Sequence, residues 1–492
     1  MPIKRTLNCL RQHVLSFLLL LLARLDAFSL EGSSLGIPAS SGWRLRLCSS
    51  ISELAAQRDF VYTSSERLST IPKLQGVETA DFQQIETDKK RIKVYCISDL
   101  HADTNINQEW VKAKCTRRPT DAECFTILMV PGDVGSEMDR IESIFDVLLD
   151  NFDLVSFVPG NHELWKRGTA SGGSATAPEK LSYEHRMAAD SVEKMKEVLA
   201  SAARKGVRTG PVRVSGGGHS VVVLPLYSWY HGSWDREPDI THQDFLDVEE
   251  VIPFHRKWGD FTMCSWPEAL VMREEFASIH RDGGASTALA DAFGYLNERF
   301  LAPCSPGSSS RHGSPLVQPG DTVLSFSHFL PRLELCPEKR FLLEPYLPRV
   351  SGSDVLREQV QRLSPHVHCF GHTHIPIDLT LDGTRYIQWP LGYSKEADKQ
   401  CAPIFNTGPL LVSDSHLSSA GGSSVPFDLP SRHTIWTNYY LSTRRRPEIT
   451  DQLAPWLHKR LGTFAGMVQS NRKRNARAQD AEGDCGVVPG NW

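Results

Sequence analysis

The sequence predicts an α/β fold in which helices flank layered β-sheet, and three observations support this prediction. Short β-rich runs at 91–98, 125–130 and 154–158 alternate with helical periodicity, which is typical of α/β layers. Polar clusters follow directly after these strands, where sheets of this kind place their ligands. Apolar residues make up 40% and charged residues 23% of the 492 residues, as in ordinary globular proteins.

The first three predicted strands each end in side chains that carry chemistry. The strand and cluster pairs are 91–98 with Asp99 and His101, 125–130 with Asp133, and 154–158 with Asn161 and His162. Between the second and third strands, apolar residues recur on one face of a predicted helix (Ile141, Ile144, Phe145 and Leu148).

The chain after residue 188 repeats this pattern. A helix whose apolar face includes Met195 ends at Gly206, and a strand follows at 220–226. The next predicted strand, 322–327, ends at His328. A helix begins after Ser353, and the strand 366–370 leads into Gly-His-Thr-His, with His372 and His374 two residues apart. The segments 375–381 and 384–389 flank Asp-Gly, which predicts a β-hairpin.

The domain organisation follows from composition. We expect a leader at 1–27, an adaptor segment at 28–89 and a catalytic domain at 90–400. Within that domain, 227–302 reads as an insertion that covers one side of the site, and 305–320 as a flexible loop rich in Ser, Pro and Gly. The C-terminal extension, 401–492, is expected to be partly disordered, because its end is basic and then rich in small polar residues.

The first 27 residues resemble a signal peptide. Basic residues precede an apolar run at 14–23, which is too short for a typical membrane span. Cleavage after Ala27 would leave Phe28, a junction that resembles the two-part plastid leaders of some algae. We therefore expect the secretory pathway or a plastid, with an uncleaved apolar tail as the alternative. No other segment is long and apolar enough to cross a bilayer.

Charge and cysteine usage exclude some functions. The net charge of −4 shows no basic excess, which argues against nucleic acid as a bulk electrostatic partner. The 11 cysteines have no compact spacing typical of a disulfide framework or a zinc knuckle. Cys96 and Cys369 lie inside apolar runs and are interpreted as core residues.

The side chains that follow the strands are donors suited to divalent metals. Carboxylates and imidazoles without thiolates favour manganese, iron or zinc. Their number suits two ions, and two ions roughly 3.5–4 Å apart clamp a phosphoryl group and lower the pKa of a shared water. Hydroxide then attacks phosphorus, and a nearby imidazole protonates the leaving oxygen. The donors are Asp99, His101, Asp133, Asn161, His328, His372 and His374.

The blocks Asp-x-His, Gly-Asp, Gly-Asn-His-Glu, a lone His and Gly-His-x-His resemble the calcineurin-like metallophosphoesterases, over roughly residues 90–400. Several other stretches, such as 225–230 and 325–332, look like a plant and algal branch of that superfamily. The resemblance implies a double β-sandwich flanked by helices and a dinuclear phosphoesterase whose bridging hydroxide attacks a phosphomonoester or phosphodiester. It further implies that the first metal is held by Asp99, His101 and His374, the second by Asn161, His328 and His372, and both by Asp133, while His162 assists the leaving group.

Two alternatives and one departure accompany the resemblance. A scaffold that kept the fold and binds protein partners without catalysis is the main alternative, although the ligand set is complete. An amidohydrolase is remote, because its His-x-His would stand on the first strand. Protein serine/threonine phosphatases carry an Asp three residues after the bridging Asp, whereas Ser136 stands here, so the partner of His162 stays open. The expected substrate is small and phosphorylated, with its identity and the oligomeric state undetermined.

Several residues have two interpretations. Glu163 orients His162 or caps a turn, and Arg332 binds phosphate or forms a surface ion pair. Asp103 either hydrogen-bonds to a metal ligand or is a polar, solvated loop residue. The aromatic residues Trp229, Tyr230 and Trp234 are interpreted as core rather than as a substrate-facing rim. The histidines interpreted as ordinary hydrogen-bonded residues are His231, His242, His366 and His368.

Overall fold

The computed structural model describes residues 74–166, 188–251, 253–267, 270, 287–301, 316–397, 399–416, 429–458 and 460–461. All of them belong to a compact unit that begins at Thr70. The expected leader, most of the adaptor segment, residues 305–315 of the loop 305–320 and the end of the C-terminal extension lie outside the described residues. No helix in the described ranges is long and apolar enough to span a bilayer.

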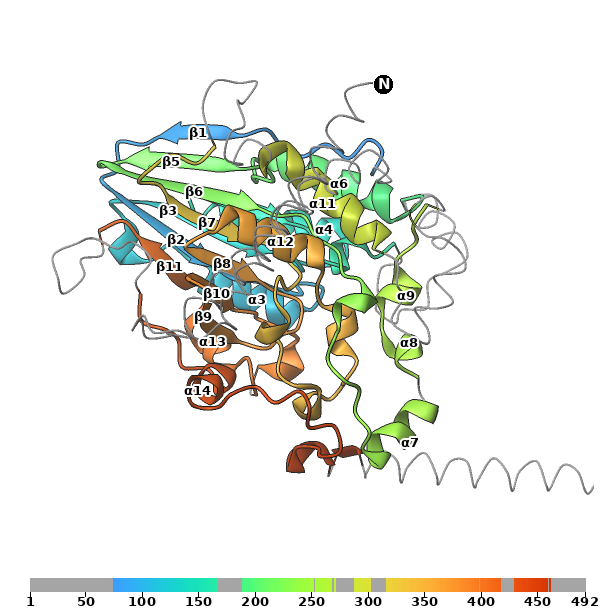
Figure 1. The fold of residues 1–492 in the computed structure, drawn as a ribbon. Coiled ribbons are helices and arrows are strands. Elements are labelled where there is room, and N and C mark those ends of the chain that lie inside the picture. The colour runs from blue at the N-terminus through green and yellow to red at the C-terminus, as the bar shows by residue number, and fades with distance from the viewer. Residues whose placement is uncertain are drawn as a thin grey trace, which may run out of the picture. The chain divides into compact units, whose positions relative to one another are not determined.

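Two β-sheets form the centre of the fold (Figure 1). The larger sheet has seven strands in the order β1-β5-β6-β7-β8-β10-β9, mostly parallel, with antiparallel pairs β5–β6 and β10–β9. Its strands are β1 (Gln83–Glu86), β5 (Val212–Gly216), β6 (His219–Pro225), β7 (Thr322–Phe326), β8 (Val367–Phe370), β9 (Ile377–Leu381) and β10 (Thr384–Gln388).

The smaller sheet has four strands in the order β11-β2-β3-β4. The pairs β2–β3 and β3–β4 are parallel, and β11 is antiparallel to β2. The strands are β2 (Arg91–Cys96), β3 (Cys124–Pro131), β4 (Leu154–Val158) and β11 (Leu410–Asp414). Each sheet therefore has an outer strand, β1 or β11, that lies beyond the range 90–400.

The two sheets pack face to face, and one hydrophobic core lies between them. Alternation along β6 shows how: Val221 and Val223 join the core between the sheets, whereas Val222 and Leu224 face outward to a separate cluster with Phe300. Both faces of β6 are thus buried. This double sandwich with flanking helices is the architecture that the family resemblance implied, rather than a single doubly wound sheet.

Helices cover the outer faces of both sheets (Figure 1). Helix α4 packs on β4 and α6, while α11 and α12 pack against each other. Local signals explain the ends of α6: the Asp190 carboxylate accepts hydrogen bonds at its start, and Gly206 with φ 93° ends it. The helices are α3 (Asn105–Lys114), α4 (Met138–Leu149), α6 (Ser191–Lys205), α7 (Gln243–Val251), α8 (Phe254–Lys257), α9 (Asp260–Met263), α11 (Ala288–Leu301), α12 (Asp354–Leu363), α13 (Ala402–Thr407) and α14 (Ile435–Ser442).

The predicted hairpin joins β9 and β10. Asp382 and Gly383 both have positive φ, 49° and 86°, as a two-residue turn between twisted antiparallel strands requires. Arg385 on β10 forms a buried two-pronged pair with Asp378 on β9, at 2.7 and 2.8 Å. This pair also binds the following segment, because Arg385 donates to the Leu429 carbonyl.

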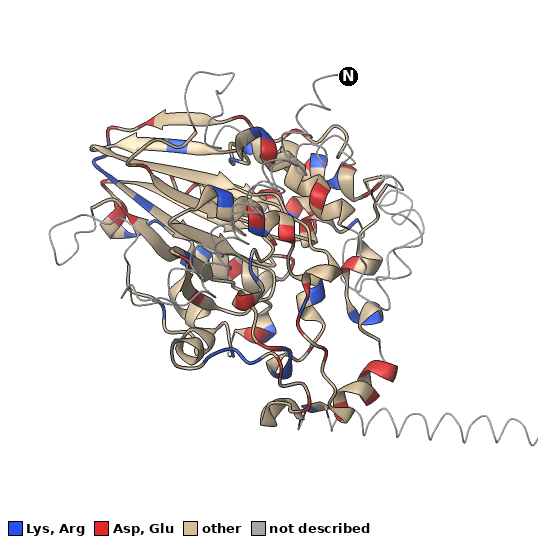
Figure 2. Cartoon of the chain, viewed as in Figure 1, with Lys and Arg blue, Asp and Glu red and all other residues tan. Residues whose placement is uncertain are grey.

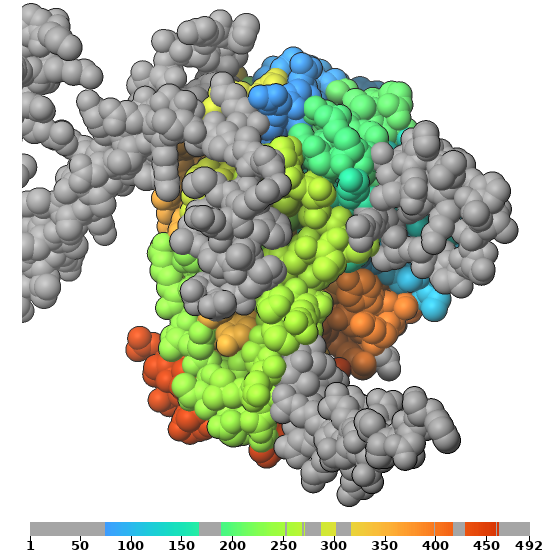
Figure 3. Space-filling model, turned by 90° about the vertical axis from the view of Figure 1, so that its right-hand side faces the viewer, coloured from blue at the N-terminus to red at the C-terminus, as the bar shows by residue number. Residues whose placement is uncertain are grey.

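The segment 227–302, expected to be an insertion, supplies α7, α8, α9 and α11. Helices α7, α8 and α9 run along one face of the molecule. In Figure 3 their light-green surface borders the orange surface of residues near 400. Figure 2 shows acidic and basic residues interspersed over the elements, with the strands of the sheets largely free of charge. The insertion therefore adds helices and loops beside the sandwich and no further strand to it among the described residues.

Candidate active site

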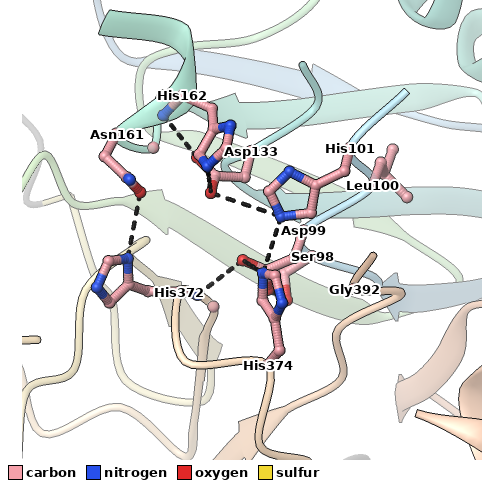
Figure 4. Close-up of polar contacts among 12 residues, drawn as sticks. Ser98, Asp99, Leu100, His101, Asp133, Asn161, His162, His372, His374 and Gly392 are labelled. Atoms are coloured by element: carbon pink, nitrogen blue, oxygen red, sulfur yellow. Dashed lines mark hydrogen bonds and ion pairs between the residues drawn. The ribbon is translucent and has the colours of Figure 1, made fainter. Parts of the chain in front are cut away.

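Five strands deliver the candidate site residues from their carboxyl ends. Strand β2 leads to Asp99 and His101, β3 to Asp133, β4 to Asn161 and His162, β7 to His328, and β8 to His372 and His374. The structure brings all eight together, and each is at most 7% exposed. Figure 4 labels all of these residues except His328 and shows the labelled site side chains turned toward one another.

The backbone at the site adopts conformations that are rare for residues other than glycine. Asp99, His101, Asp133, His372 and His374 all have positive φ, between 41° and 78°. Among the described residues only two other non-glycine positions do so, one of them in the hairpin turn. Such conformations cost about 1–3 kcal/mol each and persist only where the surrounding structure imposes them. Strain in the described backbone is therefore concentrated at this site.

Four of the donors form a first group. Ligand atoms of Asp99, His101, Asp133 and His374 all lie within 4.8 Å of one another. The Nε2 atoms of His101 and His374 are 2.8 Å apart, and His374 Nε2 is 3.6 Å from Asp99 Oδ1. These residues come from three different strands, so the group exists only in the folded chain.

The remaining three donors form a second group beside the first. Asn161 Oδ1 lies 2.9 Å from His328 Nε2 and 3.2 Å from His372 Nδ1. Asp133 stands between the groups. Its Oδ2 is 3.8 Å from His101 Nε2, and its Oδ1 is 3.6 Å from His328 Nε2. Each carboxylate oxygen of Asp133 thus faces a different group.

Hydrogen bonds to the outer atoms of His328 and Asn161 show that the lone pairs of His328 Nε2 and Asn161 Oδ1 point toward each other. His328 Nδ1 donates to the Pro131 carbonyl at 2.9 Å, so in the neutral ring Nε2 carries a lone pair. Asn161 Nδ2 donates to Asp260 at 2.8 Å, which turns the amide oxygen toward that lone pair. Two acceptors 2.9 Å apart repel each other unless a cation lies between or beside them. The donor set therefore fits a metal ion.

The first group has the same feature. His374 Nδ1 donates to Glu396 at 2.8 Å, which leaves its Nε2 as an acceptor aimed at His101 and Asp99. A carboxylate behind the ring is a common partner of metal-binding histidines. The chemistry of both groups, carboxylate, amide and imidazole without thiolate, suits manganese, iron or zinc.

Burial keeps most of these imidazoles neutral. Burial, together with neighbouring imidazoles, lowers the pKa of His101 and His372, and burial lowers the pKa of His328 to about 4. Burial opposes protonation of His374 as well, but the hydrogen bond that its ring donates to Glu396 and the charge of Asp99 raise its pKa. Burial and nearby carboxylates raise the pKa of Asp133. A cation would reverse that effect, because it favours the ionised carboxylate.

His162 lies at the edge of the two groups. Its Nε2 is 3.9 Å from Asp133 Oδ2 and 3.3 Å from the Tyr393 hydroxyl, and its ring stacks on Trp165 with centroids 3.6 Å apart. Ser136 does not take the place of the missing aspartate, because its hydroxyl and amide both bind Asp103. The partner of His162 that the sequence left open is therefore the Tyr393 hydroxyl. Asp103 instead connects its own loop to the loop of Ser136 by hydrogen bonds.

Glu163 and Gly160 shape the loops that carry the ligands. The Glu163 carboxylate accepts the backbone N–H groups of Asp133, Val134, Gly135 and Gly160 at 2.6 to 3.1 Å. Of its two interpretations, backbone capping is confirmed. At Gly160 a Cβ atom would lie 2.2 Å from Asp133 Oδ1, so only glycine allows the aspartate to approach.

The other open interpretations are resolved. Arg332 pairs with Glu334 and Asp382 and is therefore an ion-pair residue. Trp229, Tyr230 and Trp234 are buried in the cluster beside the larger sheet. His368 bonds the Ser325 and Ser327 hydroxyls at 2.8 and 3.0 Å, and His366 accepts the Val323 amide, so both are satisfied structural histidines. Cys96 and Cys369 lie in the core between the sheets.

Three residues that contact the site have no signal in the sequence. Asp260 belongs to the insertion, and Tyr393 and Glu396 follow the last strand of the larger sheet, outside all five blocks. All three line a cavity of about 830 Å³ together with Asn161, His162 and the paired histidines. The cavity extends from the metal-binding groups to the exposed cations Lys395, Lys399 and Arg460 and the exposed ring of Trp456. Residues 254 and 257–260, within the segment 227–302, also line this cavity.

A search of curated proteins finds one similar sequence that aligns with more than half of this chain. No protein-family model matches the chain. The [acyl-carrier-protein] phosphodiesterase PptH of Mycobacterium tuberculosis is 22% identical over 307 residues, which are 62% of this chain and 78% of PptH.

Solved structures give weaker matches. The crystal structure of the phosphopantetheinyl hydrolase PptH aligns with 68% of this chain and 100% of its own, at 17% identity and a TM-score of 0.42. A putative 5'-nucleotidase from Staphylococcus aureus aligns with 61% of this chain and 48% of its own, at 12% identity and a TM-score of 0.25.

Three findings taken together bear on the superfamily. The five sequence blocks stand in order after five strands, their donors converge in the folded chain, and PptH resembles the chain over most of its own length. These findings support a relationship between the chain and the calcineurin-like metallophosphoesterase superfamily, and they are consistent with a metal-dependent phosphoric ester hydrolase.

Proposed function

We propose that this protein is a dinuclear metal-dependent phosphodiesterase. The observation that supports it most is the pair of donor groups that share Asp133, with lone pairs aimed inward. When bound, two divalent ions supply a nucleophilic water at neutral pH and polarise the phosphoryl oxygens. One ion would be held by Asp99, His101, Asp133 and His374, and the other by Asp133, Asn161, His328 and His372.

The residues of the chain have distinct tasks in this proposal. Asp133 would contribute one carboxylate oxygen to each metal position, because its two oxygens face different groups. His162 lines the cavity beside Asp133 and assists the leaving oxygen. The Tyr393 hydroxyl, 3.3 Å from His162 Nε2, and the stacked ring of Trp165 hold the imidazole in place.

The cavity has room for a substrate much larger than phosphate itself. The space of about 830 Å³ reaches beyond the metal-binding groups in a region lined by Phe341, Trp436 and Trp456, with Lys395 and Lys399 at its edge. A phosphate at the metal centre would thus have room for a bulky organic substituent, and the resemblance to PptH favours a diester. PptH is named for the phosphodiester of an acyl carrier protein, so a carrier protein that bears phosphopantetheine is one substrate to test.

The test uses the full chain loaded with manganese. We expect turnover of bis(p-nitrophenyl) phosphate that exceeds turnover of p-nitrophenyl phosphate, and we expect release of phosphopantetheine from a loaded carrier protein. Replacing His162→Ala should lower kcat by about 10²–10⁴-fold while two ions remain bound. A protein that holds two ions and cleaves neither ester class would be a non-catalytic scaffold instead.

A further inference from the structure

One buried carboxylate outside the ligand set holds much of the site together. Asp260, the first residue of α9, is 2% exposed. Its Oδ1 accepts Asn161 Nδ2 at 2.8 Å and Trp165 Nε1 at 2.7 Å, and its Oδ2 accepts Trp258 Nε1 at 2.9 Å. Tyr230 also hydrogen-bonds to it. Every partner is a donor, which matches an ionised carboxylate with acceptor oxygens only.

Each indole that binds Asp260 in turn contacts a histidine of the site. Trp165 stacks on His162 with ring centroids 3.6 Å apart, and Trp258 meets His372 edge-on at 5.7 Å. Gly259, next to Asp260, permits the approach of Trp165, because a Cβ atom there would lie 2.9 Å from the indole ring. One carboxylate therefore orients a metal-binding amide and two rings that pack on active-site histidines.

We propose that Asp260 is a positioning residue of the second metal position, and that the insertion is thereby part of the catalytic machinery rather than only a cover. This inference rests on the proposed dinuclear function. The physical reason is the orientation of the Asn161 amide, whose two ends differ in chemistry although they are alike in shape. Asp260 accepts only from Nδ2, so Oδ1 must face His328 and His372. Without that acceptor the amide is free to turn its N–H₂ group toward His328 Nε2, and the ion would lose a ligand.

The experiment measures metal content in purified full-length variants. After dialysis against limiting chelator we expect two manganese ions per chain in the wild type and one in Asp260→Ala. Asp260→Asn should be intermediate, because its amide presents oxygen to Asn161 in only one of two orientations. In Asp260→Asn we expect the affinity for the second ion to fall by about 10-fold. This is the lower end of the loss in metal affinity that follows when a hydrogen bond supporting a ligand is removed.

Thr262→Ala, in the same helix α9, is the matched control. It removes an exposed hydrogen bond to the Gly259 carbonyl but leaves every hydrogen bond of the Asp260 carboxylate in place, so two ions should remain. A role limited to stability would lower the melting temperature of Asp260→Asn without a selective loss of one ion. Two ions of wild-type affinity in both folded Asp260 variants would overturn the inference. A wild-type chain that binds no metal would refute the proposed function instead.

Discussion

Glu396 offers a graded test of the first metal position. Its Oε2 accepts both His374 Nδ1 and the Tyr393 amide, each at 2.8 Å. The bond to His374 fixes the tautomer that leaves Nε2 available to a cation, and the negative charge increases the basicity of the ring. Glu396→Gln keeps an oxygen that accepts both bonds but loses the charge. Glu396→Ala loses both and leaves the Tyr393 amide without this acceptor.

Loss of such a partner lowers metal affinity by about 10–100-fold, which is about 1.4–2.7 kcal/mol. We expect Glu396→Gln near the lower limit and Glu396→Ala near the upper one. The assay is competition for manganese with a fluorescent chelator at pH 7.5, followed by kcat at saturating metal. Ser394→Ala, in the same short helical turn (Ser394–Glu396), is the control and should bind metal like the wild type. Equal affinity in all four proteins would show that Glu396 does not set the orientation of His374.

Three further predictions concern stability and local geometry. Burial lowers the pKa of His368 to about 3. Between pH 6.5 and about 3 the unfolded chain therefore binds one more proton at this residue than the folded chain does. The free energy of unfolding consequently decreases as the pH is lowered through this range. His368→Asn should therefore lose less unfolding free energy than the wild type between pH 7 and 5 in urea titrations. Gly160→Ala should abolish manganese binding, measured by metal analysis of the folded variant, because its Cβ would overlap Asp133. Arg385→Ala should cost about 3–5 kcal/mol in urea unfolding, since it leaves the Asp378 carboxylate buried and unpaired, and a loss below 1 kcal/mol would contradict the pairing.

The sequence located the donor side chains that converge in the folded chain, because each stands in a local pattern. Asp99, Asp133 and Asn161 come directly after apolar β-rich runs, and the ends of strands are recognisable without the fold. The hairpin at Asp382 and Gly383 was equally readable from its turn residues. The type of element and the identity of the ligands are local properties, so local spacing was enough.

The outer strands and the residues behind the ligands were not readable in this way. Strand β1 lies in a polar stretch, and β11 lies in the extension where periodicity is weak, so both depend on pairing with β5 and β2. Asp260 is an ordinary acidic residue until the insertion places it against Asn161, 99 positions earlier.

By itself, the sequence determined which side chains can bind metal and that they follow strands, because strand periodicity and turn chemistry act over a few neighbouring residues. The tertiary structure alone decided that two sheets enclose the core, that Asp133 divides its oxygens between two donor groups, and that Tyr393, Glu396 and Asp260 support them. These contacts join residues far apart in the chain, and their energies depend on burial and on the direction of lone pairs. Neither quantity is defined until the whole domain has folded.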